Sequence, residues 1–302
     1  MTVRNLDRYR GCLLGLAVGD AIGTTVEFQP RGSFAPVSDM TGGGVFHLQP
    51  GQWTDDTSMA LCLATSLVEK NGFDTLDQMQ RYLRWYDEGY LSSTGKFFDI
   101  GSSTRQALER FRATGKPLSG SKHPSSAGNG SLMRLAPVVM FYAPNLARAK
   151  TYAGKSSSTT HAAEECVQAC KLFAGMLVSA LGGRDKETIL FQNSLSGKEP
   201  EKIMAIARGA YREKTAQHIR GNGYVIDALE AALWCFWKTN SFAEAVLAAA
   251  NLGDDADTTA AICGQLAGAY YGLTGIPDTW LEKLALRTEI TRLAEQLAES
   301  KP

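Results

Sequence analysis

Apolar residues recur at intervals of three and four along almost the whole of this chain. That spacing places them on one face of an α-helix, which repeats every 3.6 residues. Alternating runs of β-branched residues, which mark strands, are scarce, and "GGGVFHLQPG" is the best short extended segment. The sequence therefore predicts an all-α fold. The helical pattern covers 6–22, 57–69, 76–86, 104–112, 163–181, 224–237, 242–250, 259–273 and 280–297.

Glycine-rich and polar clusters separate these helical segments. Helical patterns flank every cluster, and neither a repeat of fixed period nor a long linker is present. A chain of 302 residues can bury about 75% of the surface that its unfolded form exposes. We therefore expect one compact multi-helix domain over residues 1–302. The clusters fall at 29–52, 113–131, 154–160, 182–186 and 194–200.

Two of the predicted helices carry glycine at every fourth position. A glycine inside a helix costs about 1 kcal/mol relative to alanine, so a stripe of them needs a compensating reason. A bare helix face lets a second backbone approach closely. We therefore expect both helices to be central and tightly packed, with a contact between the two as one arrangement that satisfies this. The alternative is that each glycine relieves local crowding. The stripes are Gly11, Gly15, Gly19 and Gly23, and Gly264, Gly268 and Gly272.

Composition narrows the class of protein. Lys and Arg number 31 against 31 for Asp and Glu, which argues against a strongly basic nucleic-acid-binding protein. No signal peptide is recognised, and the most apolar stretch, 258–276, is too rich in small residues for a membrane span. The six cysteines form no Cys-x-x-Cys pair, which indicates free buried thiols. We expect a cytoplasmic monomer that binds no nucleic acid.

Two short acidic segments stand out from the helical background. They are "WTDDTSMALCLA", with Asp55 and Asp56, and "NLGDDADTTAAICG", with Asp254, Asp255 and Asp257. Each runs into a helical pattern, where one carboxylate can cap the helix and suit its dipole. Capping does not account for two or three carboxylates, whose mutual repulsion a divalent cation would relieve. Two interpretations stay open: a shared two-metal site, or caps with solvated loop charge.

Seven segments then appear in a fixed order over roughly residues 8–290. Together they resemble the ADP-ribosylglycohydrolase family, especially bacterial members of the dinitrogenase-reductase-activating type. No single segment is specific, whereas seven in order, two of them acidic clusters with threonines, are. The segments are "GCLLGLAVGDAIGTTVEF", "GQWTDDTSMAL", "DIGSSTRQAL", "GNGSLMRLAPV", "TTHAAEEC", "GYVIDALEAALWCF" and "GDDADTTAAICGQLAGAYYG".

The resemblance implies an all-α fold whose cleft holds two divalent cations, Mg²⁺ or Mn²⁺. It also implies that Glu27, in "TVEF", is a metal ligand or an acid/base residue, and that Asp99, in "DIG", contacts metal-bound water or substrate. Either carboxylate could orient or deprotonate the attacking water, and the choice between them is open. Taken alone, Glu27 could be a surface residue and Asp99 a helix cap. The metal ligands implied by the resemblance are Thr54, Asp55, Asp56, Asp255, Asp257 and Thr258.

The same resemblance implies a set of residues that bind ADP-ribose. Most belong to "GNGSLM", whose backbone N–H groups, ahead of an apolar helix, can bind phosphate. His161 is expected beside the nucleotide, with a core or capping role as the alternative, and Tyr224 near the adenosine. Asp254 stands where related bacterial enzymes often have glycine, and we favour a capping or solvent-facing role for it. The set is Gly128, Asn129, Gly130, Ser131, Met133, His161 and Tyr224.

The resulting hypothesis is a metal-dependent hydrolase that removes ADP-ribose from modified protein side chains. The bacterial-type motifs favour arginine, with serine-linked ADP-ribose and O-acetyl-ADP-ribose as alternative substrates. An ADP-ribosylated protein would be the substrate and ADP-ribose the product. Two other classes of protein fit the sequence less well. An all-α isoprenoid synthase needs Asp-Asp-x-x-Asp spacing, which is absent here. A non-catalytic ADP-ribose-binding protein would not need the intact acidic set.

Overall fold

The computed structural model describes residues 3–192 and 197–300. Within these ranges the chain is built from helices, and its extended pairings are isolated bridges, such as Gly43 with Leu48. The predicted all-α fold is therefore confirmed. The α-helices are α1 (Val3–Gly23), α2 (Asp55–Lys70), α3 (Thr75–Glu88), α4 (Ser102–Thr114), α5 (Ala136–Tyr142), α6 (Leu146–Thr160), α7 (Glu164–Leu181), α8 (Lys186–Phe191), α9 (Glu201–Ala207), α10 (Val225–Lys238), α11 (Phe242–Ala250), α12 (Ala256–Tyr271), α13 (Asp278–Lys283) and α14 (Arg287–Glu299).

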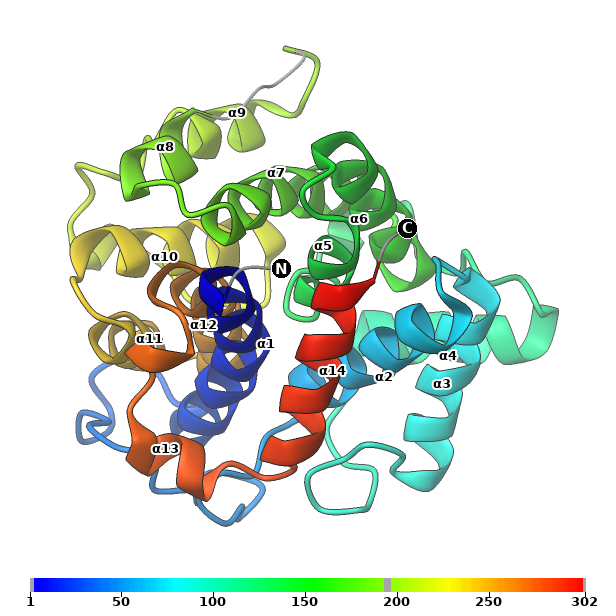
Figure 1. Cartoon of the computed structure of the whole chain (residues 1–302), viewed down its shortest axis with the longest axis horizontal. Coiled ribbons are helices and arrows are strands. Elements are labelled where there is room, and N and C mark those ends of the chain that lie inside the picture. The colour runs from blue at the N-terminus through cyan, green and yellow to red at the C-terminus, as the bar shows by residue number, and fades with distance from the viewer. Residues whose placement is uncertain (1–2, 193–196, 301–302) are drawn as a thin grey trace.

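Helices α1 and α12 form the centre of the fold and lie against each other (Figure 1). A Cβ atom added at Gly15 would collide with the carbonyl oxygen of Gly264, and one at Gly264 with that of Gly15. Gly11 and Gly268 face each other in the same way. The prediction that the two helices are central and tightly packed is confirmed, because these four glycines leave room for the partner backbone. Gly272, just past the end of α12, instead leaves room for the side chain of Asp7.

The remaining helices surround this central pair. Helices α10 and α11 pack on α12, α14 packs on α1 and α2, and α6 packs on α7, which reaches α12 (Figure 1). The buried apolar side chains form one continuous cluster, and all six cysteines lie buried as free thiols. No helix in the described part of the chain combines the length and apolar character needed to cross a membrane.

One predicted break is wrong, because residues 154–160 are the second half of α6. Two of their hydroxyl groups donate to carbonyls of the same helix, Ser158 Oγ to Gly154 O at 2.9 Å and Thr159 Oγ1 to Ser156 O at 2.7 Å. Gly154 itself leaves space for a side chain of α7, since an added Cβ would lie 2.8 Å from Lys171 Cε. The break predicted at 194–200 lies partly outside the described residues.

The predicted helix over 280–297 is also wrong in one respect, because it is two helices. Helix α13 ends at Lys283, and α14 begins at Arg287. Between them, Leu286 has a φ of 52°, a left-handed conformation that a continuing helix excludes. An apolar residue at that position gives no sign of a turn, so the periodicity runs through the break.

Candidate active site

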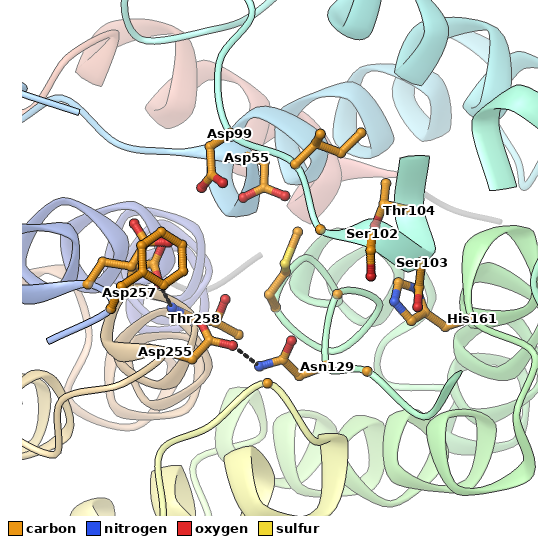
Figure 2. A pocket seen from close by; sticks show the side chains of 18 residues that line it. Asp55, Asp99, Ser102, Ser103, Thr104, Asn129, His161, Asp255, Asp257 and Thr258 are labelled. Atoms are coloured by element: carbon orange, nitrogen blue, oxygen red, sulfur yellow. Dashed lines mark hydrogen bonds between the residues drawn. The ribbon is translucent and has the colours of Figure 1, made fainter. Parts of the chain in front are cut away.

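The two acidic segments meet at one cavity of about 370 Å³ (Figure 2). The first turn of α2 supplies Asp55, and the first turn of α12 supplies Asp257 and Thr258. The loop after α1 adds Glu27, and the loop before α4 adds Asp99. Helix α1 packs against both α12 and α2. Carboxylates that are far apart in the sequence therefore converge on one place.

Three of these carboxylates could hold a cation. Oxygens of Glu27, Asp99 and Asp257 lie within 4.8 Å of one another. Glu27 Oε2 and Asp56 Oδ1 are buried and hydrogen-bond to no described residue. A buried carboxylate oxygen without a donor is costly unless it is protonated or bound to a cation. Carboxylates and threonine hydroxyls are ligands that Mg²⁺ and Mn²⁺ prefer, so the residues fit a hard divalent cation.

The electrostatics of the cluster lead to the same conclusion. Burial raises the pKa of Glu27 to about 10, with the charges of Asp99 and Asp255 adding to the shift. Burial likewise raises the pKa of Asp99 to about 6 and the pKa of both Asp55 and Asp257 well above the ordinary range. Carboxylates held this close keep protons until a cation replaces them, because metal ligation needs the ionised form.

Two of the predicted ligands, Thr54 and Asp56, are buried beside the cavity rather than lining it. Thr54 Oγ1 lies 3.1 Å from Asp257 Oδ2. In the opposite direction, Thr258 Oγ1 donates to Asp56 Oδ2 at 3.3 Å. These contacts join the two acidic segments to each other, which indicates a single site rather than two separate ones.

Sequence reasoning missed Asp20, a fully buried carboxylate on α1. It accepts hydrogen bonds from the backbone N–H groups of Thr54 at 2.9 Å and Thr57 at 3.0 Å, and from both hydroxyls. Asp20 therefore caps α2 from a neighbouring helix, and burial raises its pKa to about 6. An acidic residue inside the glycine stripe "GLAVGDAIG" was the available signal.

This arrangement argues against the capping interpretation of the acidic segments. Thr54, at the N-cap of α2, makes no side-chain capping bond, and neither does Asp255 at the N-cap of α12. Helix capping is therefore not what the paired carboxylates do. Asp55, Asp255 and Asp257 instead face the cavity, where a cation would meet them.

Asp254 faces solvent, as its sequence context favoured. Its φ of 56° and the φ of 63° at Phe28 are both left-handed. The two strained residues lie side by side, since Phe28 N donates to Asp254 O at 2.7 Å and Asp254 N donates to Gln29 O at 2.8 Å. The pairing holds the Glu27 loop against the second acidic segment. Backbone strain of this kind persists where surrounding structure imposes it, often at functional sites.

Glycines, hydroxyls and a few apolar side chains line much of the rest of the cavity. The first turn of α4 contributes residues 102–104, with its positive dipole end facing an incoming anion. The loop before α5 contributes Gly128, Asn129 and Gly130. Asn129 Nδ2 donates to Asp255 Oδ2 at 2.8 Å, the dashed contact in Figure 2. Sequence reasoning did not single out residues 102–104, although "GSST" at a helix start was a visible signal.

The backbone of the "GNGSLM" loop corrects one expectation. Gly128 N donates to Ser126 O at 2.8 Å, and Asn129 N donates to Gly223 O at 3.1 Å. Met133 N donates to Asn129 O at 3.2 Å. These three N–H groups are therefore engaged within the chain. The prediction that they bind phosphate is wrong for them, although all three residues line the cavity.

The last predicted residues differ in position. Ser131 is buried outside the cavity, with its hydroxyl 2.8 Å from that of Ser157. Tyr224 lines a neighbouring hollow of about 420 Å³, and its hydroxyl donates to Glu165 at 2.6 Å. His161 lines the main cavity, and burial, helped by the charge of Arg134, lowers its pKa to about 3. His161 is therefore neutral.

Comparison with known proteins identifies the class that this fold and acidic cavity define. The sequence profile described as "ADP-ribosylglycohydrolase" matches residues 1–302. The chain belongs to the ADP-ribosylglycohydrolase family, which confirms the resemblance read from the seven segments.

Individual relatives agree with that assignment. The chain is 48% identical over 297 residues to the ADP-ribosylarginine hydrolase Tri1 of Pseudomonas putida (strain GB-1), covering 98% of this chain and 79% of the relative. It is 32% identical over 287 residues to the ADP-ribosyl-[dinitrogen reductase] glycohydrolase of Rhodospirillum rubrum, covering 94% and 92%. A solved structure described as an "ADP-ribosylglycohydrolase-related protein complex" matches with a TM-score of 0.87 at 45% identity, over 99% of both chains.

Proposed function

We propose that this protein hydrolyses the glycosidic bond between ADP-ribose and a modified arginine side chain of a protein substrate. The observation that carries the proposal is the convergence of Glu27, Asp99 and both acidic segments on one cavity whose other walls include glycines and the hydroxyls of residues 102–104. Such a cavity joins a cation-binding end to an end suited to a diphosphate. Arginine is preferred over serine because relatives at 48% and 45% identity are named ADP-ribosylarginine hydrolases.

The cofactor in this proposal is a pair of divalent cations, Mg²⁺ or Mn²⁺. When bound, they supply positive charge that holds the ribose hydroxyls and activates water. The residues proposed to hold them all supply side-chain oxygen atoms and line or adjoin the cavity. They are Thr54, Asp55, Asp56, Asp255, Asp257 and Thr258.

The chain's own residues then position the substrate. The first turn of α4, at residues 102–104, presents hydroxyls and its helix dipole to the diphosphate. Gly128 and Gly130 line the cavity, and their bare backbone leaves room for the imidazole of His161 beside them. Asn129, by donating to Asp255, keeps that carboxylate turned toward the cavity.

The proton transfers fall to Glu27 and Asp99. As the bond between the anomeric carbon and the guanidine nitrogen breaks, positive charge builds up on the sugar. Water forms the new carbon–oxygen bond and gives one proton to a carboxylate, and the leaving nitrogen takes up a proton in return. Both carboxylates line the cavity, and their closest oxygens lie within 4.8 Å, so the geometry leaves either one able to act as the base.

An assay of released ADP-ribose from an ADP-ribosylarginine peptide tests the proposal. We expect Asp257→Asn to lower kcat/KM at least about 100-fold, because even partners of metal ligands cost 10–100-fold when removed. Excess EDTA should abolish turnover, and Mg²⁺ or Mn²⁺ should restore it. An ADP-ribosylserine peptide and O-acetyl-ADP-ribose, run in parallel, should turn over more slowly.

Asp254→Asn is the matched control, since it makes the same substitution three residues away at a solvent-facing position where Asn tolerates a positive φ. This control should keep wild-type kcat/KM. Full activity in EDTA, or an Asp257→Asn variant as active as the Asp254→Asn variant, would contradict the metal-dependent mechanism.

A further inference from the structure

Behind the imidazole of His161 lies a chain of buried polar groups. Arg134, in the loop before α5, is fully buried. Thr160 and His161, at the end of α6, are only 1% and 3% exposed. Arg134 Nη2 donates to Thr160 Oγ1 at 2.6 Å. Thr160 Oγ1 in turn lies 2.8 Å from His161 Nδ1. The three side chains form a continuous line from the core to the cavity wall.

Arg134 has no carboxylate partner among the described residues, which is unusual for a buried guanidinium. It donates instead to the carbonyl oxygen of Gly130 and to Thr160, and its guanidinium carbon lies 4.9 Å from the centre of the Tyr82 ring. Its contacts therefore connect residues 128–130, the glycine loop, to the last turn of α6. These two segments enclose His161.

The direction of the hydrogen bonds follows from the chemistry of the donors. A guanidinium carries donors only, so Thr160 Oγ1 must accept from Arg134. The hydroxyl hydrogen of Thr160 is then free to donate, and within the described ranges the contact that can receive it is His161 Nδ1. A neutral imidazole that accepts at Nδ1 carries its hydrogen on Nε2. The neighbouring guanidinium also keeps the ring neutral.

The glycine loop packs closely against the other edge of the ring. A Cβ added at Gly130 would lie 2.8 Å from His161 Cε1 and 3.1 Å from Nε2, and one at Gly128 would lie 3.3 Å from Nε2. The imidazole therefore rests against bare backbone, and His161 lines the cavity beside residues 102–104 (Figure 2). Any side chain at either glycine would displace the ring.

We propose that Arg134 and Thr160 are positioning residues that fix His161 as the neutral tautomer with its proton on Nε2, aimed as a donor at an oxygen of the ADP-ribose unit. That oxygen is a phosphate oxygen or a ribose hydroxyl, and both accept from a neutral imidazole N–H. The identity of the ligand rests on the proposed function, whereas the tautomer belongs to the protein alone.

Nitrogen NMR of the intact wild-type protein labelled at histidine tests the tautomer, and a variant is needed only to assign the signals. The chain has four histidines, and the signals missing from a His161→Gln sample assign those of His161. We expect wild-type His161 near neutral pH to show a protonated Nε2 and an unprotonated Nδ1. A wild-type signal with the proton on Nδ1, or on both nitrogens, would overturn the proposal.

Two substitutions at Thr160 then test its hydroxyl. Thr160→Val keeps the side-chain shape but removes the hydroxyl, so the Nε2 tautomer should lose its preference, and the Kd for ADP-ribose should rise about tenfold, the effect of one lost hydrogen bond. Thr160→Ser keeps the hydroxyl and should keep both the wild-type tautomer and, within about threefold, the wild-type Kd. Calorimetry with ADP-ribose and circular dichroism of each folded variant supply these measurements.

The outcomes separate this inference from the proposed function. A protein with the Nε2 tautomer that binds ADP-ribose but leaves ADP-ribosylarginine intact would contradict only the proposed reaction. A protein that cleaves ADP-ribosylarginine but has wild-type tautomer and Kd in Thr160→Val would contradict only the positioning roles of Thr160 and Arg134.

Discussion

At the scale of single residues, the site depends on a carboxylate that touches neither the cavity nor the expected ligand. Asp20 binds the first turn of α2 through Thr54 and Thr57, and Thr54 lies against Asp257 of the second acidic segment. A buried acceptor with this many donors is costly to replace, because each unsatisfied donor keeps its desolvation penalty. Asp20 thus sets the geometry of groups that are proposed to bind metal, although it is not one of the proposed ligands.

Replacing Asp20 with Asn should destabilise the protein by about 1–3 kcal/mol, because the amide nitrogen cannot accept from the N–H groups now served by both oxygens. Chemical denaturation with excess Mg²⁺ measures the loss. Asp254→Asn, the same change at an exposed carboxylate, should leave the free energy of unfolding unchanged. Equal stability of the two variants would show that Asp20 does not cap α2 in solution.

Residues of the site were predictable where their signal was local. Asp55 and Asp257 stand in acidic runs at helix starts, so sequence alone marked both. Asp20 was not predictable, because its partners begin 34 residues further along the chain and only the packing of α1 beside α2 joins them. For Met133 the position was predicted correctly but the interaction was not. Met133 lines the cavity, whereas its N–H donates to Asn129 O within the loop and not to a ligand.

At the scale of elements, glycine spacing was the most informative pattern after helical periodicity. A period of four put the stripes of α1 and α12 on single faces, and two such faces in one chain predicted the central contact. Helix ends were harder to predict. The hydroxyl-rich end of α6 resembles a loop by composition, and it stays helical because its hydroxyls donate to its own carbonyls and α7 packs along it.

The α1–α12 contact gives a prediction with an inverted sign. Alanine in place of a helical glycine normally stabilises a protein by about 1 kcal/mol. At Gly15 the added methyl group would meet the backbone of Gly264, so Gly15→Ala should instead destabilise by at least about 2 kcal/mol. Thermal and chemical unfolding measure the change.

Gly72→Ala is the control for this substitution, because the nearest atom to an added Cβ there is Lys70 O at 3.8 Å. It should leave stability unchanged or slightly raised. If Gly15→Ala proved as stable as Gly72→Ala, the close approach of the two central helices would be wrong.

At the scale of the whole molecule, formal charge is balanced but unevenly placed. The 31 acidic residues equal the 31 basic ones, yet one region gathers carboxyls whose pKa burial raises, among them Asp20, Glu27 and Asp99. Their leading neighbours are other carboxylates rather than basic side chains. Folding therefore creates a negatively charged site that only protons or cations can neutralise, which couples stability to both.

That coupling predicts how stability changes with pH. The native pKa is about 6 for Asp20 and about 10 for Glu27, against ordinary values of 3.8 and 4.5, so above about pH 4 the native state holds more protons than the unfolded state. Stability of the metal-free protein should then fall as pH rises through the native pKa values. We expect its melting temperature in EDTA to be several degrees lower at about pH 8 than at about pH 5.

Divalent cations should reverse this loss, because they bind the ionised carboxylates and compete with protons. Mg²⁺ or Mn²⁺ should therefore raise the melting temperature more at the higher pH than at the lower one. Asp39 and Asp77, whose pKa lies below the ordinary range, finish titrating in more acidic solution and do not oppose the trend. His161, whose pKa burial lowers from 6.5 to about 3, opposes it below about pH 6.5, but it is one group against several buried carboxyls whose pKa is raised. Asp257→Asn should shrink both effects, while Asp254→Asn should keep them. If the metal-free protein instead became more stable between about pH 5 and about pH 8, the buried carboxylates would not be protonated in the native state. The electrostatic argument that they need a cation as their partner would then be wrong.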